Sequence, residues 1–209
     1  MIEELLPAGV AWAEGPDPGE LYPVEAETVA RAVPKRQREF AAGRRCAREA
    51  LATLGFPPAP LPRGPGGAPV WPVGVLGAIT HCDGYVAAVA VRTGTVTALG
   101  VDAEPARPLP PGVLNEVSLP SERAHLAGLT AAGPAVAWDT LLFSAKESIY
   151  KAWFPSAGCW LDFTSAEVTF TPGGDFTARI LVDGPVTGYG GRWMTRDGLV
   201  LTAVTRAMG

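Results

Sequence analysis

The stretch Leu142-Phe-Ser-Ala-Lys-Glu-Ser-Ile-Tyr-Lys-Ala-Trp153 places three charged residues in an otherwise apolar run. Apolar residues recur at helical spacing through positions 134–154, which predicts one long amphipathic helix with Pro134 in its first turn. On this helix Glu147 and Lys151 are i,i+4 neighbours on one face. The same spacing is typical of solvated ion pairs worth about 0.2–0.5 kcal/mol, so the helix alone leaves a structural and a functional interpretation open.

A second acidic motif, Gly100-Val-Asp-Ala-Glu104, ends an apolar segment that is predicted to be a strand. Side chains alternate across a strand, so Asp102 and Glu104 lie on one face if the backbone is extended there. A few carboxylate oxygens, completed by water and substrate phosphate, suit Mg²⁺, and Mn²⁺ is an alternative. Asp102, Glu104 and Glu147 are therefore candidate metal ligands, and a nearby lysine would neutralise phosphate charge.

A third segment, Gly67 to Tyr85, carries His81 at the end of an apolar run and before a predicted Cys82-Asp-Gly turn. A lone histidine in such a place is more often structural than functional. Its significance depends on the motifs that accompany it.

Four segments together resemble the Sfp-type 4′-phosphopantetheinyl transferases, in particular the actinobacterial branch that activates fatty-acid, polyketide and peptide synthases. The matching segments are Phe40–Leu51, Pro69–Pro72 leading to Thr80–Cys82, Gly100–Glu104 and Phe143–Trp153. They follow the order and spacing of the family, and the resemblance covers roughly residues 33–206. Four motifs in register are far more specific than any one of them.

The resemblance implies an α+β fold in which two α/β subdomains, residues 1–104 and 105–209, form a pseudo-twofold pair with the active site between them. It implies transfer of the 4′-phosphopantetheine arm of coenzyme A to a serine of an apo acyl or peptidyl carrier protein, with release of adenosine 3′,5′-bisphosphate. Because the second half supplies what another subunit would, we expect a monomer. Carrier proteins are expected to dock near residues 112–130, with Arg123 among the contacts.

The resemblance also implies roles for individual residues. Glu147 would accept the serine proton, directly or through a bound water, and Lys151 would stabilise the departing α-phosphate. Lys146 is expected at the rim of the site, in contact with phosphate or solvent. The residues expected to bind coenzyme A are Arg36, Arg44 and His81 at the 3′-phosphate, Gly66, Gly67, Ala68 and Pro69 along the adenine, Trp160 beside the pantetheine arm, and Thr80, Asp102, Glu147 and Lys151.

Relatives often carry a lysine where Gly66 stands, and this departure removes one phosphate contact. Arg63 could take its place. The basic residues between Arg31 and Arg48 gather on a predicted helix, where a solvated face is the ordinary interpretation. Arginine's planar fork nevertheless matches phosphate oxygens, which supports the assignment of two of these side chains to coenzyme A.

Composition agrees with a globular protein. The 209 residues are 47% hydrophobic and 18% charged, and no apolar run is long enough to span a bilayer. The acidic start lacks a basic signal-peptide region, so a cytoplasmic protein without a membrane partner is expected. A net charge of −4 argues against a nucleic-acid partner. Cys46, Cys82 and Cys159 have neither zinc nor disulfide spacing and are predicted to be reduced, buried thiols.

Turn residues and periodicity predict the remaining elements. Helices are expected over 25–54, broken near Pro34, and after Leu119 with Ser118 or Ser121 as the cap. Residues 57–71 are expected to form a loop. Strands are expected around 10–12 and over 75–81, 85–92, 96–102, 165–171, 176–183, 189–195 and 199–206.

Two other functions remain possible from the sequence. A catalytically silent relative could bind coenzyme A or carrier proteins, but this predicts loss of the acidic and lysine motifs, which are all present. A Mg²⁺-dependent nucleotide pyrophosphatase would use the same groups with water as the nucleophile. Only a transferase modifies a carrier protein, so an assay of carrier modification distinguishes it from both alternatives.

Overall fold

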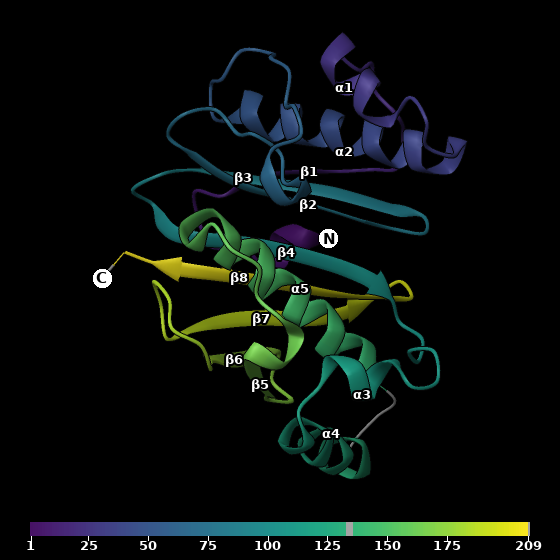
Figure 1. The fold of residues 1–209 in the computed structure, drawn as a ribbon, viewed down its shortest axis with the longest axis vertical. Helices are drawn as coiled ribbons and strands as arrows, with labels where there is room; N and C mark the ends of the chain where they lie inside the picture. The colour runs from purple at the N-terminus through teal and green to yellow at the C-terminus, as the bar shows by residue number, and fades with distance from the viewer. Residues whose placement is uncertain (133–135, 209) are drawn as a thin grey trace.

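Two antiparallel sheets, each covered by one 20-residue helix, form the fold (Figure 1). The computed structural model describes residues 1–132 and 136–208. Its helices are α1 (Pro23–Val29), α2 (Pro34–Thr53), α3 (Val113–Val117), α4 (Pro120–Ala132) and α5 (Trp138–Ala157), with short 3-10 turns at Ile2–Leu5, Pro65–Gly67 and Phe163–Ser165. Its strands are β1 (Ala11–Glu14), β2 (Val75–Cys82), β3 (Tyr85–Arg92), β4 (Val96–Pro105), β5 (Ala166–Phe170), β6 (Asp175–Ile180), β7 (Gly188–Arg196) and β8 (Leu199–Ala207). The arrangement agrees with the predicted α+β class.

The first sheet has the order β1-β3-β2 and is covered by α2. Proline has no amide hydrogen to lose at the start of a helix, and α2 begins at Pro34, where a break was predicted. The helix face toward the sheet carries small side chains, including Ala42, Ala47 and Ala50, which are fully buried against alanines of β3. Small side chains allow the helix to lie close to the sheet.

The second sheet has the order β4-β8-β7-β6-β5 and is covered by α5. Leu141, Ala145, Ile149 and Ala152 form the buried stripe that the helical periodicity predicted. Strand β4 comes from the first half of the sequence but pairs with β8, the last strand. The proposed division between residues 104 and 105 stays a prediction.

The two sheets meet where β2 runs along β4. The hydroxyl of Thr80 on β2 donates to Asp102 Oδ1 and accepts from the Ala103 amide, each at 3.0 Å. Val89 and Val101 belong to one apolar cluster that both sheets share. Packing across this junction fixes β2 relative to the acidic end of β4.

Gly100 determines how closely α5 approaches β4. A Cβ atom at this position would lie 2.0 Å from the Ser148 carbonyl oxygen and 2.8 Å from the Ala152 amide nitrogen. These are backbone atoms, which cannot move aside as a flexible side chain would. The absence of a side chain at Gly100 therefore brings the helix onto the strand, with Asp102 two residues further along.

Several local predictions require correction. The helix α3 was not predicted, because five residues give almost no periodicity. Neither serine caps α4: Ser118 donates to the Leu114 carbonyl, and Ser121 donates to Glu167. The predicted start of the long helix at Pro134 lies outside the described residues, and α5 is described from Trp138. In the described part of the chain, no helix is both long enough and apolar enough to cross a bilayer.

Candidate active site

Lys151 on α5 reaches across to β4. Its Nζ donates to Asp102 Oδ1 at 2.7 Å and to the Val101 carbonyl at 3.0 Å. The Lys151 side chain is 23% exposed and that of Asp102 only 6%, so the pair is largely shielded from solvent. Within the described residues, this lysine pairs with the strand and not with Glu147 on its own helix. The interpretation as a solvated helix pair is therefore wrong.

Three carboxylates gather beside this lysine. Asp102 Oδ2 is buried and has no hydrogen-bond partner among the described residues. Burial raises the pKa of Glu104 to about 7, and the negative charge of Asp102 adds to this shift. Burial also raises the pKa of Glu147, partly offset by the positive charge of Lys151. A cation at this place would relieve both the orphaned oxygen and the mutual repulsion.

Asp102, Glu104 and Glu147 line one pocket of about 320 Å³, together with Thr80, His81 and Lys151. In the described ranges, no three acidic, histidine or cysteine side chains are already arranged around a single point. The donor type and the unpaired oxygen fit a hard divalent cation. The metal assignment remains a proposal.

A larger cavity of about 530 Å³ adjoins this pocket and shares Ile79, Glu147 and Lys151 with it. Its walls are the loop 64–71, part of β2, and the face of α5 that carries Tyr150 and Phe154. All four predicted loop residues, Gly66, Gly67, Ala68 and Pro69, line this cavity. The structure thus brings the glycine loop and the charged helix face together around one space.

Gly66 fits closely under an aromatic ring. It has a φ of +64°, and a Cβ atom there would lie 2.7 Å from Phe154 Cζ. A lysine at this position would require both a strained backbone and a shift of the ring. Glycine, in place of the lysine that relatives often carry, therefore suits the local packing.

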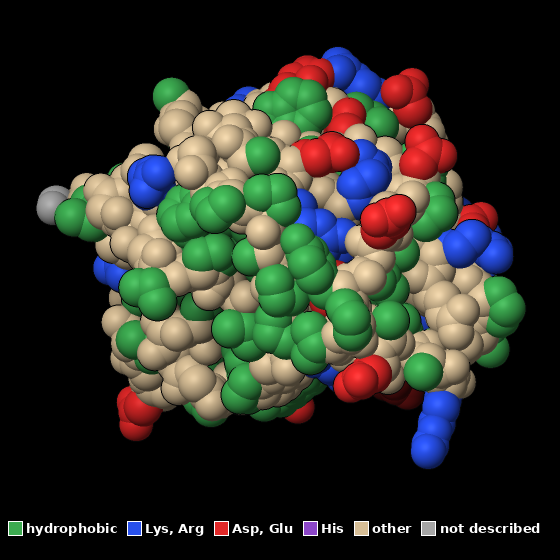
Figure 2. Space-filling view, turned by 90° about the horizontal axis from the view of Figure 1, so that it is seen from above, with side chains coloured by type: hydrophobic (Ala, Val, Ile, Leu, Met, Phe, Trp, Pro, Cys, Tyr) green, Lys and Arg blue, Asp and Glu red, His purple; other side chains and the backbone are tan. Residues whose placement is uncertain are grey.

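A basic cluster lies between α2 and the end of β2. Arg36 Nη1 contacts His81 Nε2, and His81 Nδ1 lies 3.7 Å from a Glu39 carboxylate oxygen. Burial and the charge of Arg36 lower the pKa of His81. Seen from the side of α1 and α2, Figure 2 shows basic and acidic side chains interspersed beside an apolar patch. This face therefore carries charges of both signs.

Arg44 is the most deeply buried member of this cluster. It is 4% exposed, its guanidinium lies 4.2 Å from the centre of the Phe40 ring, and its Nε has no partner among the described residues. Burial, opposed by Glu25 and reinforced by the charges of Arg48, Arg36 and Arg63, lowers its pKa to about 10. An anion here would satisfy the unpaired donor and offset the crowded positive charge.

Trp160 lies at the surface, 66% exposed, with its ring centroid 4.5 Å from that of Tyr150. Both aromatic residues line a small crevice that also includes Glu147. The sequence reasoning did not single out Tyr150. Its position three residues after Glu147 on the same helix was the available signal.

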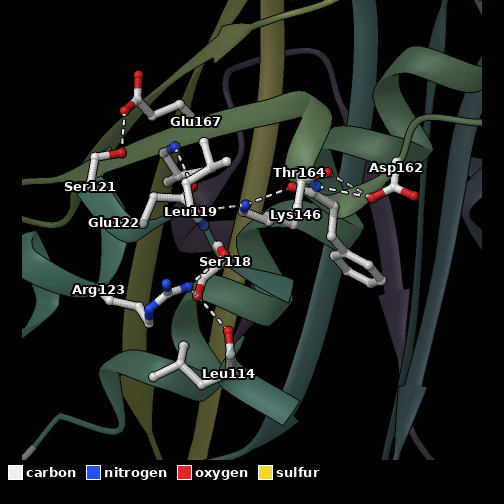
Figure 3. A network of polar contacts seen from close by, with 12 residues as sticks. Leu114, Ser118, Leu119, Ser121, Glu122, Arg123, Lys146, Asp162, Thr164 and Glu167 are labelled. Atoms are coloured by element: carbon white, nitrogen blue, oxygen red, sulfur yellow. Dashed lines mark hydrogen bonds and ion pairs between the residues drawn. The ribbon is translucent and has the colours of Figure 1, made fainter. Parts of the chain in front are cut away.

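Lys146 is not at the rim, as was predicted. It is 4% exposed and donates to Glu122 and to the Phe163 carbonyl (Figure 3). The prediction of three buried thiols is also wrong, because Cys159 is exposed and Cys82 is only half-buried. All three are free cysteines, as expected, and burial raises the pKa of Cys82 to about 12, which keeps it a thiol.

Comparison with known families gives a consistent result along the chain. The model of the 4′-phosphopantetheinyl transferase N-terminal domain matches residues 24–91, and the 4′-phosphopantetheinyl transferase superfamily model matches residues 98–200. The chain belongs to the 4′-phosphopantetheinyl transferase superfamily. This confirms the resemblance seen in the four motifs.

Relatives match over nearly the whole chain. It is 53% identical to the 4′-phosphopantetheinyl transferase Svp of Streptomyces mobaraensis, over 99% of this chain and 89% of the relative. It is 46% identical to PptT of Mycobacterium tuberculosis (98% and 97% covered) and 44% identical to Npt of Nocardia iowensis (99% and 100% covered). Enzymes of this family transfer the phosphopantetheine group of coenzyme A to carrier proteins.

Proposed function

We propose that this chain transfers the 4′-phosphopantetheine arm of coenzyme A to a serine hydroxyl of an apo acyl or peptidyl carrier protein, in a Mg²⁺-dependent reaction. The observation that carries the proposal is the meeting of Asp102, Glu147 and Lys151 with the glycine loop around two adjoining cavities, in a member of this family. The predicted monomeric state and cytoplasmic location stay predictions.

The residues assigned to coenzyme A form three groups. Arg36, Arg44 and His81 are assigned to the 3′-phosphate, because the buried Arg44 has a free donor and stands among other cations. The loop from Gly66 to Pro69 is assigned to the adenine. Trp160, whose ring contacts that of Tyr150 at a tilt, is assigned to the pantetheine arm.

Thr80 has an indirect role in this proposal. Its hydroxyl is already engaged by Asp102 and by the Ala103 amide, so it holds the carboxylate in place. Fixing one oxygen of Asp102 through Thr80 and Lys151 leaves the other oxygen free. Asp102, Glu104 and Glu147 would hold Mg²⁺, or Mn²⁺. When bound, the ion offsets the charge of the pyrophosphate oxygens.

In the reaction, the serine oxygen forms a bond to the β-phosphorus while the bond from that phosphorus to the bridging oxygen breaks. Glu147 takes the serine proton, and burial makes its carboxylate a stronger base than an ordinary glutamate. Adenosine 3′,5′-bisphosphate leaves with the electron pair of the broken bond. Lys151 is placed beside the pocket to stabilise the negative charge that this group gains.

The test is the intact mass of an apo carrier protein after incubation with coenzyme A, Mg²⁺ and this chain. Transfer adds one phosphopantetheine group. A silent binding module leaves both the carrier and coenzyme A unchanged. A pyrophosphatase leaves the carrier unchanged while it releases phosphopantetheine and adenosine 3′,5′-bisphosphate.

A further inference from the structure

A buried ion pair connects α4 to α5 (Figure 3). Lys146 Nζ lies 2.8 Å from Glu122 Oε2, and the two side chains are only 2% and 1% exposed. Lys146 Nζ also donates to the Phe163 carbonyl at 2.7 Å. We call these two residues the Glu122–Lys146 strut.

Both oxygens of the Glu122 carboxylate accept hydrogen bonds. Glu122 Oε2 accepts from the Leu119 amide and Oε1 accepts from the Val168 amide, each at 2.7 Å. Together with Lys146, it therefore joins four segments: the start of α4, the middle of α5, the turn at Phe163, and β5. Every contact is a charge-assisted hydrogen bond in a site with little access to water.

A buried ion pair of this kind adds little net stability to the fold. Desolvation of two charges can cost as much as their attraction returns, and well-packed apolar residues of similar volume are often equally stable. Apolar side chains, however, would not fix the backbone at Leu119, Phe163 and Val168 in direction and register. The contacts of the strut point to a geometric role.

The strut lies directly beside the proposed catalytic base. Lys146 precedes Glu147, and Phe163 follows Trp160 by three residues. Phe163 is held twice, by its carbonyl on Lys146 and by its ring, which stacks on Phe143 with centroids 5.6 Å apart. One crevice is lined by Lys146, Glu147, Tyr150, Trp160 and Phe163.

We propose that Glu122 and Lys146 are positioning residues for the pantetheine arm. They hold the segment 160–164 against α5, so that Trp160 borders the same crevice as Glu147. This inference rests on the proposed function, because it assumes that the arm lies against Trp160 at the rim of this crevice. The crevice itself has a volume of about 10 Å³, which is too small for the arm. Neither residue is expected to touch coenzyme A.

The test compares the parental chain with Lys146→Met and with the double variant Glu122→Gln/Lys146→Met, which leaves no charge at the strut. Three quantities are measured: the KM for coenzyme A, kcat on an apo carrier protein, and the Kd of adenosine 3′,5′-bisphosphate. The bisphosphate lacks the pantetheine arm. Displacement of Trp160 removes an apolar contact to the arm, and burial of one large apolar side chain changes affinity about 10- to 150-fold. We therefore expect the KM for coenzyme A to rise about 10- to 100-fold, with the Kd of the bisphosphate changed less than about twofold.

Ser144→Ala is the matched control on the same helix. Ser144 is fully buried and pairs with Thr202, on the side of α5 that faces β8. Its loss should lower thermal stability without raising the KM for coenzyme A. A purely structural strut would behave in the same way, because unfolding removes active molecules without changing the affinity of the rest.

The proposal is overturned if the folded double variant keeps the parental KM, or if the Kd of the bisphosphate rises as much as that KM. If Lys146→Met does not fold, the double variant decides. If the parental chain does not modify any carrier protein, the proposed function fails separately. The strut is then judged by the direct Kd of coenzyme A against that of the bisphosphate.

Discussion

Replacing Lys151 by Met tests whether this lysine serves the reaction or only the fold. The change removes two hydrogen bonds, to Asp102 and to the Val101 carbonyl, and leaves a buried carboxylate with Thr80 as its remaining partner. A hydrogen bond to a charged group contributes about 1.5–3 kcal/mol. A loss of this size in a chain of about 200 residues corresponds to a Tm lower by about 3–12 °C.

The effect on activity should be larger than the effect on stability. The Lys151 ammonium is proposed to stabilise the negative charge that develops on the leaving bisphosphate. Loss of the ammonium should therefore lower kcat and kcat/KM together. Removal of one such electrostatic donor costs about 100- to 1,000-fold in kcat. The KM for coenzyme A should change little.

Steady-state kinetics with coenzyme A and an apo carrier protein measure both constants, and thermal melting follows the fold at the assay temperature. Arg179→Met is the matched control, since it also removes a cation. Arg179 is exposed on β6 and pairs with Glu167 of β5. Such a solvated pair contributes little to stability. A folded Lys151→Met variant with parental kcat, or one in which only KM rises, would refute the assignment.

Other variants test the rest of the site. Asp102→Asn and Glu147→Gln should each abolish transfer while circular dichroism stays parental, and excess chelator should mimic both; full activity under any of these conditions would contradict the metal assignment. Arg44→Met and His81→Ala should raise the KM for coenzyme A about 10- to 150-fold, the loss of one charge-assisted hydrogen bond, but affect 3′-dephospho-coenzyme A much less. Equal damage with both substrates would show that neither residue reads the 3′-phosphate. Gly100→Ala should lower stability by about 1–3 kcal/mol, because the added methyl meets the α5 backbone, and a parental melting curve would show that the helix can move away.

Local patterns predicted most of the elements correctly. The strands β2, β3 and β4 are apolar runs separated by glycine turns, and the structure places them within a few residues of the predicted limits. The sequence could not show that β4 belongs to the sheet of the second half. Its partner β8 lies about 100 residues away, and no local signal records which strands pair across that distance.

Residue type and motif order were enough to predict which charged residues form the site. Asp102, Glu147 and Lys151 line one pocket, as the motifs implied. The partner of each charge was not predictable. Lys151 pairs across to β4 instead of along its helix, and Lys146 pairs with Glu122, which lies 24 residues earlier in the sequence.

In the proposed reaction, one pocket joins a carrier serine to coenzyme A through Glu147 and Lys151. The most direct test measures, in one reaction with Mg²⁺, the carrier protein that gains phosphopantetheine and the adenosine 3′,5′-bisphosphate that is released. We expect equal amounts of the two products from the parental chain and neither from the folded Glu147→Gln variant. Bisphosphate released without modification of the carrier, or transfer at the parental rate by Glu147→Gln, would contradict the proposed reaction.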